Sequence, residues 1–274
     1  VSASDGIAKV SIGGTEYTLA QLNGKTVDTG KGVLSITSVT PSADGKSAEI
    51  GYSYTLSAAQ AHATGQGNNT LTDTIAVAVT GVEGRTDSGN VTITIVDDVP
   101  VAASHTAGSV TEDGVSLVSG NVTTASGNSF GADGKASSNE VSWGTVEAKL
   151  GAVAVNLSDY GVLVKNPNGT WSFTLDNSKV ATQALKAGDA ISVTQSYTLK
   201  DKDGDTATAN VSFQINGSAD TGTVTVNAGA GADAGKVFEA GLGNAATTET
   251  TAGTITVSAS DGIAKVSIGG TEYT

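Results

Sequence analysis

The first 18 residues of the chain return without change at its other end. VSASDGIAKVSIGGTEYT occupies residues 1–18 and again residues 257–274. An identity of this length is far beyond chance and indicates a tandem array, whose period is 256 residues because the copies begin at residues 1 and 257. That period is too long for a solenoid unit and fits a pair of ordinary domains. The chain is therefore expected to be a fragment of a longer string of domains.

Composition favours strands over helices. Glycine is abundant (36 residues), proline is scarce (3 residues), and no segment keeps a 3.6-residue apolar period over several turns. Strand-forming residues alternate with Gly, Asn, Asp and Ser turns, which predicts an all-β fold of tandem Ig-like β-sandwich domains in an elongated array. The expected strands are 7–12, 16–19, 33–39, 48–56, 74–80 and 90–96, then 110–118, 141–147, 153–157, 161–165, 171–175, 191–199 and 206–215.

A domain boundary is predicted within residues 92–101, TITIVDDVPV. Threonine and isoleucine alternate at its start, which is the period of a half-buried strand. Asp97 and Asp98 cannot extend an apolar strand face, and Pro100 lacks the N–H that a central strand needs. With a second boundary near 216–220, the chain divides into an Ig-like repeat lacking its first strands (1–98), a complete sandwich (99–218) and the N-terminal part of the next repeat (219–274).

Charge and residue types argue against several classes of function. The net charge is −13 and the pI is near 4.4, which disfavours nucleic acid and anionic membranes as partners. Cysteine is absent, so neither a disulfide framework nor a thiol nucleophile is possible. No apolar run has membrane-spanning length, so no membrane insertion is expected. His62 and His105 stand alone, with loop or surface positions expected, and no nucleophile motif is present; an enzyme is not expected.

The strongest local signal for a bound ion is Asp201-Lys-Asp-Gly-Asp205. Carboxylates at alternate positions, with a glycine that permits a sharp bend, can direct several oxygens at one cation. The frame is not an EF-hand, because Ser212 stands where that loop needs a bidentate glutamate. A solvated Asp-Gly hairpin turn is the alternative interpretation.

Chain topology is expected to place this turn beside the first boundary. If 206–215 is the final strand of its domain, the turn before it lies at the N-terminal pole, next to Asp97 and Asp98. Carboxylates crowded at one joint repel one another unless a cation neutralises them, and oxygen ligands suit Ca²⁺. One or more Ca²⁺ ions are therefore predicted there, held by Asp97, Asp98, Asp201, Asp203 and Asp205.

The same logic suggests a second joint at the far pole of the complete domain. Glu112 and Asp113 lie about one strand length beyond the linker, so they can approach Asp220, and Glu239 is their counterpart in the next repeat. A simple exposed bend at Glu112 and Asp113 is an equally good interpretation. The late turn of the first repeat contains Arg85 and departs from the Asp-rich pattern, which argues against full Ca²⁺ occupancy at alternate joints.

Several motifs resemble repeats of known adhesins. NPNGTWSFTL at 166–175 and YTLKDKDGDTAT at 197–208 resemble the VCBS-type repeat. Residues 253–274, continued as 19–101, resemble the Ig-like repeat of type I-secreted (RTX-type) bacterial adhesins. The resemblance implies the extender region of a very large surface adhesin that serves attachment or biofilm formation. Such proteins leave the cell unfolded through a type I channel and fold outside it in calcium.

Together these features predict a structural module at the bacterial cell surface whose joints with neighbouring repeats of the same chain are stiffened by Ca²⁺. The alternative is a binding module, in which one sandwich recognises a glycan or another cell. Trp143, Trp171, Phe173 and Tyr197 are expected in the core rather than on a sugar-binding face. Because 219–256 holds strands that 1–98 lacks, head-to-tail self-association of the truncated ends is also expected.

Overall fold

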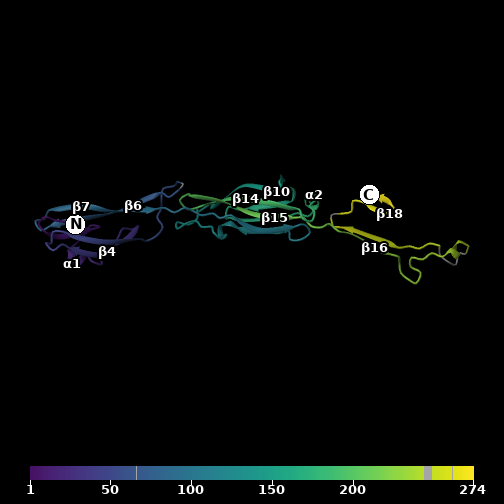
Figure 1. Cartoon of the computed structure of the whole chain (residues 1–274), viewed down its shortest axis with the longest axis horizontal. Coiled ribbons are helices and arrows are strands. Elements are labelled where there is room, and N and C mark those ends of the chain that lie inside the picture. The colour runs from purple at the N-terminus through teal and green to yellow at the C-terminus, as the bar shows by residue number, and fades with distance from the viewer. Residues whose placement is uncertain (66, 244–248, 261) are drawn as a thin grey trace.

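The computed structural model describes residues 1–65, 67–243, 249–260 and 262–274. Two β-sandwiches and a C-terminal pair of β-ribbons follow one another along a single long axis (Figure 1). The all-β prediction is confirmed: the described helical segments are single turns of three to five residues. They are α1 (Leu19–Leu22), α2 (Val180–Gln183), and the 3₁₀ turns η1 (Val122–Thr124), η2 (Leu157–Asp159) and η3 (Glu239–Gly243).

Two sheets pack face to face in the first sandwich. The four-stranded sheet has the order β2-β1-β6-β7 and the three-stranded sheet the order β3-β4-β5. Their strands are β1 (Ile7–Ile12), β2 (Thr15–Tyr17), β3 (Thr26–Asp28), β4 (Gly32–Pro41), β5 (Ala48–Leu56), β6 (Thr70–Gly81) and β7 (Thr86–Val96). Alternate residues of facing strands, among them Val10, Ile12, Leu34 and Ile36, are buried between the sheets, as the two-residue strand period requires.

The second sandwich has the larger core. Its sheets have the orders β11-β10-β14-β15-β8 and β12-β13-β9. Every second residue of β14 is buried, and Trp171, Phe173 and Phe213 pack together in the centre. The strands are β8 (His105–Thr111), β9 (Leu117–Asn121), β10 (Val141–Leu150), β11 (Val153–Ala154), β12 (Gly161–Lys165), β13 (Thr170–Leu175), β14 (Ala190–Lys200) and β15 (Thr206–Asn216).

The first and last strands of the second sandwich run parallel. β8 pairs with β15 from Val211 opposite His105 to Asn216 opposite Thr111. Parallel neighbours begin at the same end of a sheet. The linker that leads into β8 and the turn that leads into β15 therefore meet at one pole, which is the pole facing the first sandwich (Figure 1).

The C-terminal segment forms two separate antiparallel ribbons. β16 (Gly222–Asn227) pairs with β17 (Thr254–Ala259), and β18 (Val266–Ile268) pairs with β19 (Thr271–Tyr273). Neither ribbon joins a sheet of the sandwiches. All six residues of β16 are exposed, so this piece has no core of its own among the described residues.

Some strand boundaries differ from the sequence prediction for local reasons. The expected strand 110–118 is wrong: it is broken into β8 and β9 by a turn in which Asp113 adopts a left-handed φ of 55°. The strand expected at 16–19 ends at Tyr17, where Gln21 accepts a hydrogen bond from the Thr18 N–H and α1 begins. Of the four core aromatics predicted, Trp171, Phe173 and Tyr197 are buried, whereas Trp143 is only partly covered.

Candidate metal-binding joint

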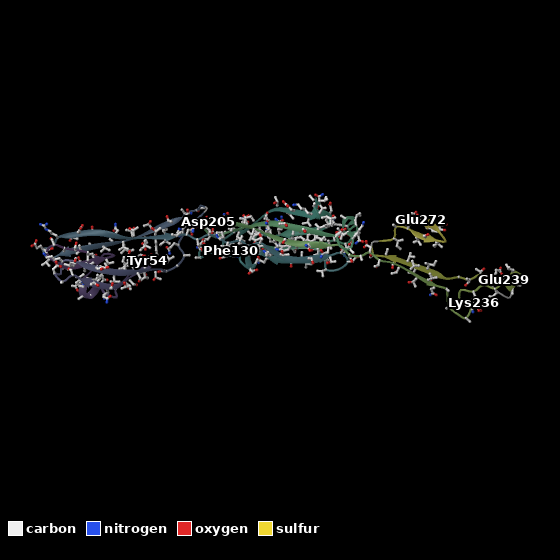
Figure 2. The ribbon with its side chains drawn as sticks, in the orientation of Figure 1. Tyr54, Phe130, Asp205, Lys236, Glu239 and Glu272 are labelled. Atoms are coloured by element: carbon white, nitrogen blue, oxygen red, sulfur yellow. The ribbon has the colours of Figure 1, made fainter. Side chains whose placement is uncertain are left out.

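Carboxylates gather between the two sandwiches. Asp97 directly follows β7, the last strand of the first sandwich, and the turn between β14 and β15 supplies Asp201, Asp203 and Asp205. Figure 2 places Asp205 where the two sandwiches meet. Asp133 joins them from the loop before β10, which an antiparallel bridge between Lys135 and Asp201 holds against the turn.

These five residues, called the acidic joint below, form two overlapping groups. Asp97, Asp203 and Asp205 make one group, and Asp133, Asp201 and Asp203 make the other. Within each group, one oxygen from each carboxylate lies within 4.8 Å of the others. Asp203 belongs to both groups, so its carboxylate lies at the centre of the joint.

Backbone amides hold one oxygen of three of these carboxylates. Asp98 N–H donates to Asp97 Oδ1 at 2.9 Å, Gly204 N–H donates to Asp201 Oδ1 at 3.0 Å, and Gly67 N–H donates to Asp205 Oδ1 at 3.2 Å. Gly67 belongs to the loop before β6, so the last bond ties the first sandwich to the turn of the second. These bonds fix the orientation of the Asp97, Asp201 and Asp205 carboxylates independently of any bound ion.

The remaining oxygens are buried without a hydrogen-bond partner. Asp201 and Asp205 are fully buried, and Asp97 is 6 % exposed. Burying an unpaired carboxylate oxygen is costly, and native proteins rarely leave several together. The unpartnered atoms are Asp97 Oδ2, Asp133 Oδ1 and Oδ2, Asp201 Oδ2, Asp203 Oδ1 and Asp205 Oδ2. A site of this kind is completed by a group that accepts many oxygen ligands at once, which is the property of a hard cation.

Burial and crowding also change the acidity of the joint. Burial raises the pKa of Asp201 to about 7, and the neighbouring Asp203 adds to the effect. Burial likewise raises the pKa of Asp97. Burial acts to raise the pKa of Asp203 as well, but the neighbouring carboxyl groups of Asp201 and Asp97, together with backbone amides, outweigh it and the pKa is lowered. Without a cation, the Asp201 carboxyl is therefore partly protonated near neutral pH.

In the absence of divalent cations, stability is expected to fall as pH rises. The pKa of Asp201 is about 7 in the folded protein against an ordinary value of 3.8. A raised folded pKa contributes stability that is complete below the ordinary pKa and lost as pH rises through the folded pKa. Denaturant unfolding in chelator, in buffers spanning this range, measures the effect. Asp201→Asn should flatten the profile, and a wild-type profile that is already flat would contradict the burial argument.

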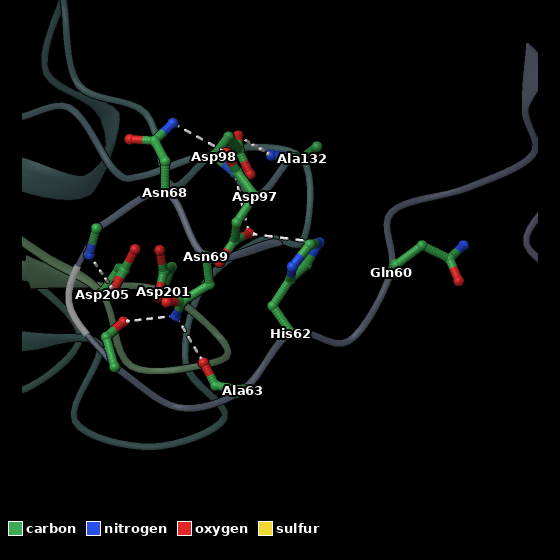
Figure 3. Close-up of polar contacts among 12 residues, drawn as sticks. Gln60, His62, Ala63, Asn68, Asn69, Asp97, Asp98, Ala132, Asp201 and Asp205 are labelled. Carbon is green, nitrogen blue, oxygen red and sulfur yellow. Dashed lines mark hydrogen bonds and ion pairs between the residues drawn. The ribbon is translucent and has the colours of Figure 1, made fainter. Parts of the chain in front are cut away.

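The structure separates Asp98 from the other four carboxylates predicted for this joint. Asp98 belongs to neither group of converging carboxylates, and its Oδ2 instead accepts a hydrogen bond from Ala132 N–H at 2.7 Å (Figure 3). The side chain faces the loop before β10, whereas the adjacent Asp97 faces the joint. Consecutive residues of an extended chain point to opposite sides, so one of the pair had to turn away.

Asp133 and His62 were not recognised from the sequence as parts of the joint. The signal for Asp133 was only an Asp-Gly pair in a polar loop, 68 positions before Asp201. His62 lies in a loop, one of the two positions expected for it, but its side chain is only 4 % exposed and its Nε2 lies 3.9 Å from Asp97 Oδ1. His105 lies in β8 with its ring edge-on to Tyr197.

The residues predicted for the second joint do not converge in the described part of the chain. Glu112 is 1 % exposed, and its Oε2 accepts a hydrogen bond from Ser218 N–H at 3.1 Å. An exposed bend therefore describes Asp113 but not Glu112, which ties down the linker that leaves β15. Asp220 and Glu239 are exposed, and neither group of converging carboxylates includes any of these four residues. Figure 2 shows Glu239 at the far end of the C-terminal segment.

Comparison with known proteins gives weak likenesses only. No family model matches the chain, and the curated proteins contain no significant match. Among solved structures, the extracellular domain of protocadherin gamma B4 is 15 % identical over 82 % of this chain and 32 % of that chain, with a TM-score of 0.31. The N-terminal eight Ig domains of Down syndrome cell adhesion molecule are 9 % identical over 81 % of this chain and 25 % of that chain, with a TM-score of 0.21.

A third likeness is to titin domains Z1Z2 in complex with telethonin, at 10 % identity over 77 % of this chain and 83 % of that chain, with a TM-score of 0.24. The chain spans about a third of the protocadherin and a quarter of the adhesion molecule. In the described part of the chain no helix is both long and apolar enough to cross a bilayer. The chain itself is an all-β array of tandem Ig-like sandwiches with clustered carboxylates that could hold a metal ion.

Proposed function

We propose that this chain is an extender module of a giant bacterial surface adhesin, stiffened by Ca²⁺ bound at the acidic joint. The observation that supports Ca²⁺ most directly is the set of buried carboxylate oxygens that lack a donor. The exact tandem repeat and the resemblance to type I-secreted adhesin repeats support the extender role. An extender needs many similar domains in line and a resistance to bending at each junction.

The chemistry of the acidic joint fits Ca²⁺ better than other metals. Ca²⁺ takes about six to eight oxygen ligands in flexible geometry, whereas Zn²⁺ prefers a small tetrahedral set rich in nitrogen or sulfur. The joint offers carboxylates from five residues, and the chain has no cysteine. Because Asp203 is shared by both groups, it can serve two ions or one ion in either position.

The position of the joint explains how a bound ion would stiffen the array. Asp97 belongs to the linker after the first sandwich, and the other four carboxylates belong to the second sandwich. A cation that binds both sets ties the end of one domain to the pole of the next. Bending at the linker would then break metal–oxygen contacts, so the ion opposes it.

The test combines thermal melting with small-angle X-ray scattering, first in millimolar Ca²⁺ and then in excess chelator. A site with a Kd of about 10⁻⁴–10⁻³ M, typical of extracellular modules, is stabilised by about 1.4–2.7 kcal/mol at ~10 mM Ca²⁺. We expect a higher melting temperature and a longer, narrower distance distribution in Ca²⁺. Mg²⁺ is the matched control, because it demands a tight octahedron and should give a smaller gain. Coinciding curves in Ca²⁺ and chelator would refute the proposal.

A further inference from the structure

A groove with an apolar base and a polar rim runs along one side of the first sandwich. It has a volume of about 740 Å³ and lies between β5, the edge strand of one sheet, and β7, the edge strand of the other. A closed sandwich covers such a seam, because leaving it open exposes the core of both sheets to water. The apolar side chains at its base include Leu34, Ile36, Ile50, Val77, Val79 and Val91.

The start of the chain already lies on the free edge of β5. Val1 N–H donates to Ala48 O at 3.0 Å, and Ala48 N–H donates to Val1 O at 2.9 Å. Ser2 forms an antiparallel bridge with Ser47, and Val1 lines the groove. Because the pairing is antiparallel, a residue preceding Val1 would face Glu49, and the one before it would face Ile50.

The exact repeat identifies a strand that continues this pairing. Residues 257–259 of β17 are Val-Ser-Ala, identical to residues 1–3. Aligning the two copies of the repeat therefore places the earlier part of β17 along β5. Thr256 then lies opposite Glu49, Ile255 opposite Ile50, and Thr254 opposite Gly51.

This register directs the correct face of β17 into the groove. Side chains two residues apart in a strand share a face, so Ile255 points the same way as Val257, the equivalent of the groove-lining Val1. The threonines at 254 and 256 point outward. Nothing in the repeat itself requires this agreement, since a shift of one residue would direct threonines inward.

The partner strand of β17 presents matching apolar side chains. Val224 pairs with Val257, and Val226 pairs with Ile255, so all four belong to one face of the β16–β17 ribbon. Val224, Val226 and Ile255 are 69, 67 and 52 % exposed. An isolated two-stranded ribbon is marginally stable in water, and a free sheet edge is a ready template for another strand. The ribbon has an exposed apolar face without a cover, and the groove has apolar side chains and a free strand edge that the ribbon can cover.

We propose that the groove is the docking site for the β16–β17 ribbon of a second copy of this chain. β17 adds antiparallel to β5, its residues 257–259 replace the identical residues 1–3, and the sheet becomes β3-β4-β5-β17-β16. The contact joins the tail of one molecule to the head of the next. Because the two surfaces differ, the association is open-ended and builds linear chains rather than closed dimers.

Sedimentation velocity of the 274-residue protein over a range of concentrations tests the proposal, with chelator present so that the result is independent of the acidic joint. We expect species that grow with concentration beyond a dimer. Ile255→Asp should weaken association at least about tenfold, because it buries an unpaired charge in the groove. Thr254→Asp, one residue away on the outward face and opposite Gly51, is the matched control and should associate as the wild type does.

A second measurement identifies the groove itself. A chain extended before Val1 by a further copy of residues 219–256 carries its own ribbon in continuous register. Because this ribbon fills the groove within the same chain, the extended protein should not bind the ribbon of a second molecule there. Its first sandwich should also melt at a higher temperature. Hydrogen exchange should show protection of the Ile50 and Tyr52 amides, which alternate with the Ala48 amide on the free edge. A wild-type protein that stays monomeric at millimolar concentration, or equal behaviour of the two aspartate variants, overturns the proposal.

Discussion

Replacing Asp203 with asparagine is expected to remove most of the stabilisation that Ca²⁺ gives to the acidic joint. Asp203 belongs to both groups of converging carboxylates, so the change removes a charged ligand from each at almost constant volume. In Ca²⁺ the variant should lose about 1.4–2.7 kcal/mol, the full gain expected from a site of extracellular affinity. In chelator the sign should reverse, because the wild type keeps crowded carboxylates there and the variant has one fewer.

The opposite sign in the two media separates a metal ligand from a residue that merely supports the fold. Melting curves and Ca²⁺ titration calorimetry of wild type and variant, each in both media, provide the measurement. Asp220→Asn is the matched control: Asp220 is an exposed carboxylate in the linker after the second sandwich and belongs to neither group. It should change neither curve appreciably. Equal destabilisation of the Asp203 variant in Ca²⁺ and in chelator would rule out a ligand role.

The second large effect is expected from Phe213→Ala in β15. The Phe213 side chain is 1 % exposed and stacks on Trp171 with ring centroids 5.6 Å apart. It also packs against Phe173 at 5.1 Å. Removing it leaves a cavity between the two sheets, for which large-to-small aromatic substitutions cost about 3–5 kcal/mol. The second sandwich should melt at a temperature lower by at least about 6 °C, because even larger domains shift by roughly 2–4 °C per kcal/mol.

Differential scanning calorimetry can follow the second sandwich as a separate transition. Val180→Ala is the control for losing an aliphatic side chain from the same sandwich, because Val180 is 86 % exposed in α2. Its effect should stay within about 0.5 kcal/mol. Phe213→Leu, which keeps much of the volume, should lie between the two. If Phe213→Ala melts as Val180→Ala does, the aromatic cluster is not the centre of the core.

Local sequence signals predicted the fold class and most of the strands. Runs of strand-forming residues between turn signals gave β5 as 48–56 and β12 as 161–165 with the same bounds as the structure, because both signals are local. The strand signals failed where a local turn conformation or a short-range hydrogen bond interrupts a strand. The left-handed Asp113 divides β8 from β9, and the bond between Gln21 and Thr18 begins α1, although the flanking residues are good strand formers.

The acidic turn at Asp201, Asp203 and Asp205 was likewise readable from the sequence, because alternating carboxylates around a glycine are a local pattern. The final-strand argument placed that turn at the pole of the linker, and the parallel pairing of β8 with β15 gives the physical reason for it. Which carboxylates meet there was a different question. Asp133 comes from a distant loop through its bridge at Lys135, and Asp98 turns away toward Ala132.

The sequence by itself therefore determined what repeats along the chain: the strand period, the turns and the 256-residue array. Only the tertiary structure decided what meets across it. The membership of the acidic joint, the burial of His62 and Glu112, and the open groove between β5 and β7 all depend on residues separated by long stretches of chain. Residue spacing reports neighbours on one strand, whereas contacts between strands are set by sheet order and register, which emerge only when the whole domain packs.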